Sequence, residues 1–487
     1  MDRRACPRRL VLTVASCRVP SVLSEIAAAC FAEHALGTHF TDLPAIAVER
    51  AKVFMLDSIG VGIAGSSVEG GEELLQVAAS WGAPIAGSPT VPVWGRALRL
   101  SAPAAAFMNA WQMHNQEYDG LHEGAVVHAM ASVLPAALAA AEMAGGASGA
   151  ELITAVAVGV DIAAGLGLAA QAGFRFFRPA TAGGFGAAAA AARLLGLDRA
   201  ALRRAFAWQL AQASGTMQAH VEGSPILPVQ VAFNARAALQ SCALATLPFA
   251  AAERVFEGDY GYLRLFEGEF ALDPVLQSLG RDWRIAEFSH KPFPAGRATH
   301  GGIEGASALQ QRYGFDASEV AAIEIAAPPL ILRLVGRPAY PEMSASYARL
   351  CLAWTIARVL MNGRLDLADF RGPALADPAT HALASRVSLK NDGNPDPNAL
   401  APQRVIVRLE DGTEHHWSCE TMLAHPARPL TREQHLAKFH RCLYFAASPL
   451  AAHAGARLVE AIDHLDSMED VRVLAALVAT SPRADDA

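Results

Sequence analysis

The sequence contains few charged and few aromatic side chains. Charged residues make up 18% of the 487 residues and aromatic residues 7%, whereas the hydrophobic share is 52%. The formal net charge is −7, so the basic excess that nucleic-acid-binding proteins carry is missing. The apolar share is dominated by Ala, Leu and Val, which lets helix axes approach closely. This composition predicts packed helices and no nucleic-acid partner.

Motifs for redox chemistry, structural metals and nucleotides are also missing. The cysteines form no C-x-x-C pair, and they lie at positions 6, 17, 30, 242, 351, 419 and 442. A dispersed, odd set is typical of a reducing compartment, so we expect a cytoplasmic protein without a disulfide framework. No G-x-G-x-x-G follows a predicted strand and no Walker lysine is found, which argues against a nucleotide site. We expect no cofactor.

No apolar run predicts a membrane span. Ala129–Gly145 and Leu152–Ala170 are long and apolar, but Glu142 and Asp161 interrupt them, and both runs are rich in Ala and Gly. Core helices of a large helical domain explain these runs better than a membrane does. We therefore expect no membrane partner.

The first 21 residues differ from the rest of the chain. Met1–Arg4 and Arg8-Arg9 precede the apolar run Leu10–Ala15, which Cys17 follows. The arrangement faintly resembles an export signal, but its apolar run is short for that purpose. We expect residues 1–21 to be a disordered or mis-started leader.

The pattern of apolar residues divides the remaining chain into helical and mixed parts. Residues 22–271 consist of small-residue segments that Gly and Pro separate. The expected helices there are Leu43–Ala64, Ala102–His114, Ala129–Gly145, Leu152–Ala170, Phe185–Leu195, Arg199–Gly215 and Pro228–Leu247. Strand-like alternation occurs only later, as in Val320–Ala327.

Residues 272–422 combine that strand with other elements. Arg404–Trp417 alternates around a turn at Asp411-Gly412, and Tyr347–Met361 is expected to be helical. Helices resume over Thr431–Leu477. The sequence therefore predicts a mainly α protein: a large all-helical domain over residues 22–271 and 423–480, with an inserted, smaller α+β lid domain over residues 272–422.

Histidines and carboxylates cluster before one of the apolar helices. The cluster contains His114, Glu117, Asp119, His122, Glu123 and His128 within fifteen residues. His114 and Glu117 are three apart and share a helix face, and a histidine beside a carboxylate forms a tunable acid/base pair. An ordinary polar loop is the alternative, but this loop joins two strongly apolar helices. A Zn²⁺ or Fe²⁺ site is a further alternative, yet the spacing matches no compact ligand motif, so we expect no metal.

Two further segments could bind an anion. In Lys291–Gly302, Arg297 and His300 precede an expected helix, an arrangement suited to a carboxylate. A proline-rich linker is the alternative there. In Arg175–Gly186, a Gly-rich turn before a poly-Ala helix could hold an anion on backbone N–H groups. A plain helix entry with surface arginines is equally compatible with that segment.

These motifs, in this order, resemble the MmgE/PrpD family, which includes 2-methylcitrate dehydratase, cis-aconitate decarboxylase and iminodisuccinate epimerase. The resemblance extends from about Leu43 to Phe439. Its landmarks are Ala51-Lys52, Leu56–Gly60, the cluster at 114–128, Gly186–Ala190, Leu194–Leu197, Lys291–Pro294, Arg297-x-Thr299-His300, Ala348–Cys351, Asn362-Gly363 and Lys438-Phe439. The resemblance implies a helical domain with an α+β lid, usually a homodimer, and an active site between the two domains.

The family's catalytic pattern carries over only in part. The resemblance places an acidic catalytic group at Glu117 and a histidine at His128, with matches at Asp119 and His122, and a lid histidine at His300. It therefore implies general acid–base catalysis by these five residues.

Three positions depart from the family pattern. Arg178 stands where members usually have a histidine, Ile226–Gln230 replaces a Lys-Arg pair, and Trp354 replaces a tyrosine, although Tyr347 is about two turns away. Losing the lysine removes a cation and losing the tyrosine removes a possible acid, while Arg178 restores one positive charge but is a poor base. The predicted substrate contacts are His114, Arg178, Gln230, Arg297 and Trp354.

The resulting expectation is a cofactor-independent lyase, a dehydratase or decarboxylase of a small di- or tricarboxylate. His128 is the expected base or acid, Glu117 and Asp119 set its protonation, and Arg178, Arg297 and His300 hold substrate carboxylates. An epimerase or isomerase would use the same groups. A non-catalytic paralogue that binds a carboxylate is the third possibility, because the lysine and the tyrosine are lost.

Overall fold

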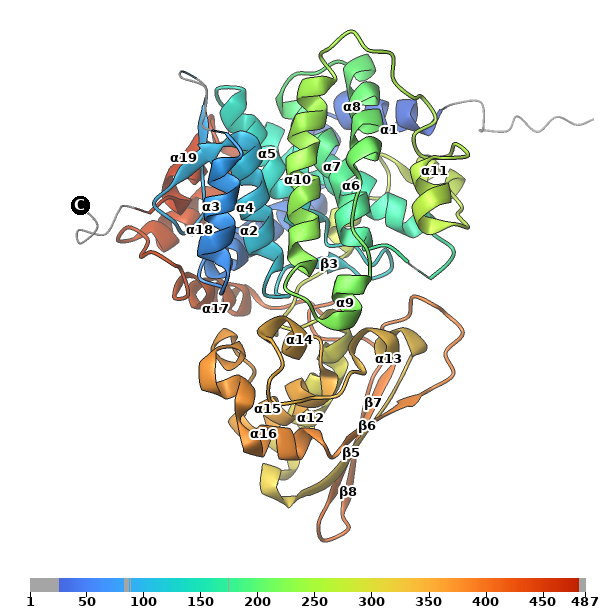
Figure 1. The fold of residues 1–487 in the computed structure, drawn as a ribbon, viewed down its shortest axis with the longest axis vertical. Coiled ribbons are helices and arrows are strands. Elements are labelled where there is room, and N and C mark those ends of the chain that lie inside the picture. Colours follow the sequence, from blue (N-terminus) through green and yellow to red (C-terminus); the bar gives the residue numbers. More distant parts are fainter. Residues whose placement is uncertain (1–25, 83–86, 88, 174, 481–487) are drawn as a thin grey trace, which may run out of the picture.

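A computed structural model describes residues 26–82, 87, 89–173 and 175–480. The described chain forms two bodies stacked along its long axis, a larger helical body and a smaller body that contains a β-sheet (Figure 1). The leader expected over residues 1–21 lies outside the described residues. One helix, α6, is long and apolar enough to cross a membrane, and 94% of its apolar window is buried inside the protein.

The helical body takes its elements from both ends of the chain. Its helices are α1 (Ala27–Gly37), α2 (Ala45–Gly65), α3 (Gly71–Ser80), α4 (Ala102–His114), α5 (Ala129–Met143), α6 (Gly149–Ala169), α7 (Arg178–Leu194), α8 (Arg199–Gln212), α9 (Gln218–Glu222), α10 (Leu227–Leu244), α11 (Asp273–Ser278), α17 (Arg432–Leu443), α18 (Ala454–Asp463) and α19 (Arg472–Val478). β1 (Thr90–Pro92) and β2 (Arg99–Ser101) pair antiparallel beside them. The helices expected from small-residue periodicity are therefore confirmed; most of their ends differ by a few residues, but α7 begins at Arg178 and not at the expected Phe185.

Helix α7 lies at the centre of this body, between α5, α6, α8 and α10. Glycines let its backbone approach its neighbours: a Cβ on Gly159 of α6 would lie 2.7 Å from the carbonyl oxygen of Gly186. Gly184 faces the side chains of Gln209 and Asn234 in the same way. The expected Gly-rich turn before this helix is wrong, because α7 begins at Arg178 and the glycines are packing positions inside it.

The smaller body has a four-stranded sheet in the order β6-β5-β7-β8. Its strands are β5 (Val320–Ala327), β6 (Val387–Asn391), β7 (Gln403–Leu409) and β8 (Glu414–Cys419). β5 and β6 are parallel and the other pairs antiparallel. The expected turn at Asp411-Gly412 joins β7 to β8. Helix α12 (His300–Tyr313) packs on β7 and β8, and Gly305 makes room for Val405 and Trp417.

The smaller body has further helices, and one of them faces the helical body. They are α13 (Pro329–Val335), α14 (Ala345–Arg349), α15 (Leu352–Asn362) and α16 (Pro378–Ala384). The single helix expected over Tyr347–Met361 is wrong, since the chain breaks at Leu350-Cys351, where Cys351 has extended backbone angles. The break leaves α14 beside α9 at the junction between the bodies (Figure 1).

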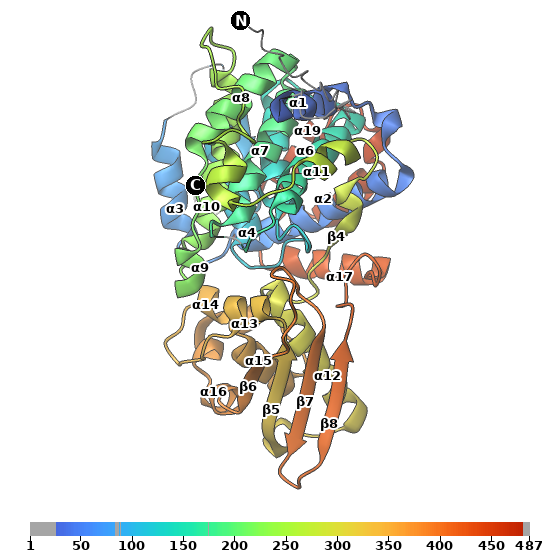
Figure 2. The same cartoon turned by 90° about the vertical axis from the view of Figure 1, so that its right-hand side faces the viewer.

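Short strands and α17 connect the two bodies. β3 (Leu121–His122) pairs antiparallel with β4 (Phe288–Ser289), which precedes the segment entering the smaller body. α17 lies at the junction and packs against α2 (Figure 2). There Lys438 forms an ion pair with the buried Asp57 at 2.7 Å and donates a hydrogen bond to the carbonyl of Tyr118. The loop that carries the histidine cluster is thus held by two contacts, the pairing of β3 with β4 and the hydrogen bond from Lys438 of α17 to Tyr118.

Candidate active site

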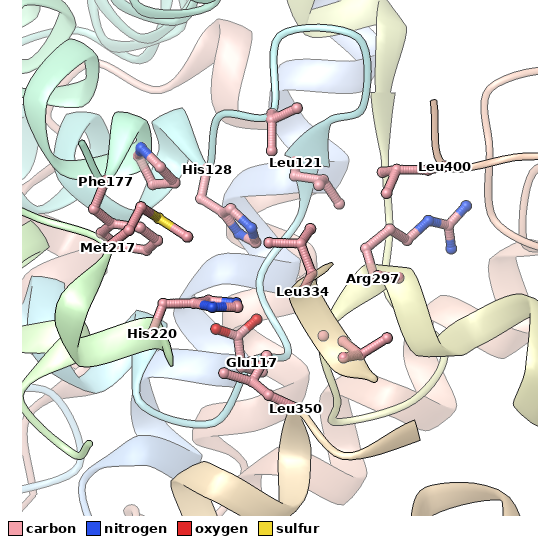
Figure 3. Close-up of a pocket in the computed structure, with 15 residues that line it drawn as sticks. Glu117, Leu121, His128, Phe177, Met217, His220, Arg297, Leu334, Leu350 and Leu400 are labelled. Carbon is pink, nitrogen blue, oxygen red and sulfur yellow. The ribbon is translucent and has the colours of Figure 1, made fainter. Parts of the chain in front are cut away.

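A small cavity of about 60 Å³ lies between the two bodies. From the helical body it is lined by Glu117, Leu121, Val126, His128, Phe177, Pro179, Met217 and His220. From the smaller body it is lined by Gly296, Arg297, Ala298, Leu334, Val335, Leu350 and Leu400. Figure 3 shows His128, His220 and Glu117 pointing into the same space. A mostly apolar cavity with a few convergent polar groups is the usual form of a small-molecule site.

The loop between α4 and α5 places two of these polar groups. α4 ends at His114, and two residues of the following loop, Glu117 and Val126, have positive φ angles of 50° and 52°. This conformation costs roughly 1–2 kcal/mol for a residue other than glycine. Such strain often marks a functional position, and here the strained Glu117 carries its carboxylate into the cavity.

Asp119 connects two histidines of the cluster. Its Oδ2 atom lies 3.0 Å from Nδ1 of His128 and 3.0 Å from Nδ1 of His114. Burial alone would raise the pKa of Asp119, but the two histidines outweigh it and hold that pKa well below its ordinary value. An ionised carboxylate only accepts hydrogen bonds, so both Nδ1 atoms donate.

The consequence for His128 is a free Nε2 atom directed at the cavity. Burial lowers the pKa of His128, and the attraction of Asp119 only partly offsets this, so the imidazole is neutral at neutral pH. With Nδ1–H donated to Asp119, Nε2 of the neutral ring carries a lone pair. His128 therefore has the protonation state and orientation of a general base.

His114 and Lys291 hold Glu117 in its charged form. Lys291 is fully buried, and its Nζ atom lies 2.7 Å from Oε2 of Glu117. Burial would raise the pKa of Glu117, but Lys291 and His114 outweigh it and lower that pKa to about 2. Burial also acts to lower the pKa of His114, yet Asp119 and Glu117 raise it overall. Lys291, Glu117, His114 and Asp119 thus form one chain of alternating charge, which ends at the neutral His128.

His220 on α9 is a further imidazole in the cavity wall. It is 6% exposed, and its ring lies beside Glu117 in Figure 3. Burial, with Arg337 as the second cause, lowers the pKa of His220 to about 4. Arg337 of the smaller body donates a hydrogen bond of 2.7 Å to the carbonyl of His220. The cavity therefore holds two neutral histidines, one beside Asp119 and one beside Glu117.

Three predicted site residues are directed elsewhere. His122 accepts a hydrogen bond from the N–H of Ala125 and donates one of 2.7 Å to Glu287. His300 is buried and donates from Nε2 to the carbonyl of Ala295, so it does not line the cavity. The guanidinium of Arg297 is turned away from His128, and its Nη2 atom lies 2.7 Å from Oε1 of Glu123 (Figure 3). In this structure Arg297 and His300 make these contacts within the protein, and their expected role as a carboxylate clamp stays a prediction.

Three further predicted substrate contacts lie outside the cavity wall. Arg178 is fully buried, donates to both carboxylate oxygens of Glu267 and to the carbonyl of Ala125, and so supports the loop. Gln230 exchanges hydrogen bonds with the backbone of Thr216. Trp354 is fully buried against Phe370 at a centroid distance of 5.2 Å. None of these three side chains contributes to the cavity lining.

The polar cluster also offers atoms that a metal ion could use. Ligand atoms of His114, Asp119 and His128 lie within 4.8 Å of one another. The Nδ1 atoms of both histidines already have a carboxylate oxygen at hydrogen-bond distance, so the geometry is that of a hydrogen-bonded triad. The sequence-based expectation of no metal and no cofactor stays a prediction.

Sequence reasoning missed His220 and the role of Lys291. His220 lies on a five-residue helix with no recognisable motif, and only the chain fold brings it to Glu117. Lys291 belongs to a segment that the sequence did single out, but its distance from Glu117 along the chain is 174 residues. No local pattern could have joined that pair.

Comparison with known proteins places this chain in a family. The MmgE/PrpD N-terminal domain matches residues 29–274, and the MmgE/PrpD C-terminal domain matches residues 293–464. The chain is 27% identical over 467 residues to a cis-aconitate decarboxylase-like protein of Aspergillus oryzae, covering 90% of this chain and 94% of that protein. It is 26% identical over 457 residues to cis-aconitate decarboxylase of Mus musculus, covering 88% and 89%, and 25% identical over 457 residues to the Homo sapiens enzyme, covering 90% and 91%. The chain belongs to the MmgE/PrpD family.

Proposed function

We propose that this protein is a cofactor-independent lyase that acts on a small carboxylic acid by general acid–base catalysis. The observation that carries the proposal is the neutral His128, whose Nδ1–H is held by Asp119 and whose Nε2 is directed at the cavity. The names of the relatives, which are cis-aconitate decarboxylases, support a lyase. In this proposal the smaller body acts as a lid over the cavity.

The proposed chemistry begins at a carbon next to the substrate carboxylate. Nε2 of His128 takes the proton from this carbon, the electron pair of the C–H bond forms a double bond, and His128 then passes this proton to the departing leaving group. In a decarboxylase the order differs: the electron pair of the bond to CO₂ passes to the carbon, which then receives a proton. His220 is the second group near enough to the same space to carry a proton.

Two alternatives use the same residues. An epimerase would return the proton to the opposite face of the carbon, and the placement of His128 and His220 in one cavity is the observation that favours it. A non-catalytic carboxylate-binding protein is the other alternative. The strained backbone of Glu117 costs free energy, and so does the burial of His114, Asp119 and Lys291. A site that performs no proton transfer has no need of these features.

The test is a nuclear magnetic resonance assay of purified protein in D₂O with acids that carry one, two or three carboxylates. We expect consumption of an acid, or deuterium at its α-carbon, and a loss of at least about 10²-fold in His128→Asn, the usual contribution of a general base. The exposed His464 provides the control His464→Asn, which should keep full activity. The proposal is rejected if no acid changes, or if His128→Asn is fully active.

A further inference from the structure

Two histidines and an arginine form a separate polar cluster where the helical body meets the segment that enters the smaller body. The ring of His290 stacks on Phe54 of α2 at a centroid distance of 3.9 Å, and the ring of His435 of α17 meets it edge-on at 4.2 Å. Arg50 precedes Phe54 by about one helical turn, so both side chains share a face of α2. The cluster lies outside the lining of the cavity between the bodies.

Three polar atoms of this cluster are buried without a hydrogen-bond partner among the described residues. They are Nε2 of His290, Nδ1 of His435 and Nε of Arg50. The two histidines are only 2% and 9% exposed. Leaving buried polar atoms unpaired is unfavourable, so three such atoms in one cluster indicate that a bound molecule or ordered water pairs with them.

The charge of Arg50 favours an anion over water. Two neighbouring cations of α17 already have carboxylate partners. Lys438 pairs with Asp57 at 2.7 Å, and Arg432 pairs with Asp463 at 2.7 Å. Arg50 forms no ion pair among the described residues. The positive charge of the cluster is therefore unbalanced, and a bound oxyanion would balance it.

The two histidines can donate hydrogen bonds to the same anion. Burial, with Lys438 and Arg50 as further causes, lowers the pKa of His435 to about 4. Burial also holds the pKa of His290 well below its ordinary value. Both rings are therefore neutral at pH 7, and each carries one N–H group. A guanidinium and two imidazole N–H groups form a donor set that suits the oxygens of a phosphate or a carboxylate.

We propose that Arg50, His290 and His435 form an anion-binding site, separate from the candidate active site, for a small oxyanion such as inorganic phosphate or a carboxylate. Its ligand would contact α2 and α17 of the helical body and the segment that leads into the smaller body. That segment reaches the cavity, because Arg297 of the lining donates a hydrogen bond of 3.4 Å from Nη1 to the carbonyl of His290. An anion at this site therefore stabilises the contact between the two bodies, and it does so independently of the proposed catalysis.

Binding of small anions to the whole protein tests the proposal. Isothermal titration at pH 7 and constant ionic strength would compare phosphate, acetate and chloride on the wild-type protein, Arg50→Gln and Arg457→Gln. Arg457, exposed on α18 and also without an ion pair in the described part of the chain, provides the matched control. We expect phosphate or acetate to bind more tightly than chloride, and the tighter of the two identifies the kind of oxyanion. Arg50→Gln should weaken this binding at least tenfold, whereas Arg457→Gln should not.

The nuclear magnetic resonance signals of isotopically labelled histidines locate the ligand. The tighter-binding anion should shift the signals of His290 and His435, which His290→Gln and His435→Gln identify, and leave the signal of the exposed His464 in place. The proposal is overturned if neither phosphate nor acetate binds more tightly than chloride, or if Arg50→Gln, shown to be folded by circular dichroism, binds as the wild-type protein does. Binding that leaves both signals unshifted also overturns it, because the ligand then lies elsewhere and only water meets the cluster.

Discussion

Among single residues, Asp119 decides which nitrogen of His128 reaches the cavity. In Asp119→Asn the side-chain amide can donate to Nδ1, which would move the imidazole proton to Nε2 and remove the base. An analogous change in a serine-protease triad lowers kcat about 10⁴-fold, so we expect kcat to fall roughly 10²–10⁴-fold. The melting temperature should fall as well, because His114 loses its buried carboxylate partner. Steady-state kinetics and thermal denaturation measure the two effects. Asp119→Asn with full activity would remove Asp119 from the mechanism.

The buried His220 makes the folded protein less stable as the pH falls. Its folded pKa of about 4 lies below the unfolded value near 6.5. The unfolded chain therefore binds more protons between these values, so stability rises with pH from 4 to 6.5 and is lost as the pH falls. The histidine contributes on the order of 3 kcal/mol to this change.

Urea denaturation of His220→Gln at pH 4.5, 5.5 and 7 checks this sign. The glutamine side chain does not titrate in this range, so the variant should lose less stability between pH 7 and pH 4.5 than the wild-type protein does. The exposed His464→Gln variant should keep the wild-type slope. An unaltered slope in His220→Gln would show that other groups cause the acid sensitivity.

The sequence predicted that the candidate residues sharing one loop lie close together. Glu117, Asp119 and His128 lie within twelve residues, so their proximity in space follows from their proximity in the chain. The contacts of Arg178 and Arg297 could not be predicted for the opposite reason. Their carboxylate partners, Glu267 and Glu123, are 89 and 174 residues away along the chain. Whether a cation is free for a substrate depends on such distant pairs, which composition and spacing do not reveal.

For whole elements, periodicity was most reliable where one helix face or strand face is buried. β5 alternates between buried and partly exposed residues and occupies the predicted range Val320–Ala327. Helix α7 shows the limit, because Gly183 and Gly184 look like a turn in the sequence. In the fold they are helical positions beside neighbouring side chains: a Cβ on Gly184 would lie 2.2 Å from Nε2 of Gln209, and one on Gly183 would lie 2.9 Å from Oγ of Ser132. Local propensity favoured a turn, and tertiary packing favoured the helix.

The close contact between α6 and α7 predicts that alanine at two glycines of α7 changes the stability by different amounts. A Cβ on Gly186 would collide with the carbonyl oxygen of Gly159, whereas a Cβ on Gly183 would meet the rotatable hydroxyl of Ser132 at 2.9 Å. We expect Gly186→Ala to lower the free energy of unfolding by about 1–3 kcal/mol. Gly183→Ala should be nearly neutral, since alanine favours a helix by about 1 kcal/mol over glycine. Urea denaturation compares them, and equal stabilities would refute the close approach of the backbones.

In the molecule as a whole, the site depends on contact between two bodies. The polar groups come mainly from the helical body, and half of the apolar wall comes from the smaller body. A separation of the bodies would leave His128 and Glu117 facing water. In water neither histidine would be desolvated, and the depressed pKa values of His128 and His220 would return toward ordinary values. The contact between the two bodies is therefore needed to keep the pKa values of His128 and His220 low.

Arg337 is the side chain whose removal tests this dependence most directly. It connects the smaller body to α9 through the carbonyl of His220 at 2.7 Å, next to the hydrogen bond of Ser344 to the carbonyl of Gly223. Because one hydrogen bond is worth about 1 kcal/mol, Arg337→Ala should speed amide hydrogen exchange over residues 217–223 roughly five- to tenfold. The exposed Arg312→Ala, on the far helix α12, is the matched control. Unchanged exchange in Arg337→Ala would mean that α9 is held by the helical body alone, and that closure of the cavity does not depend on this contact.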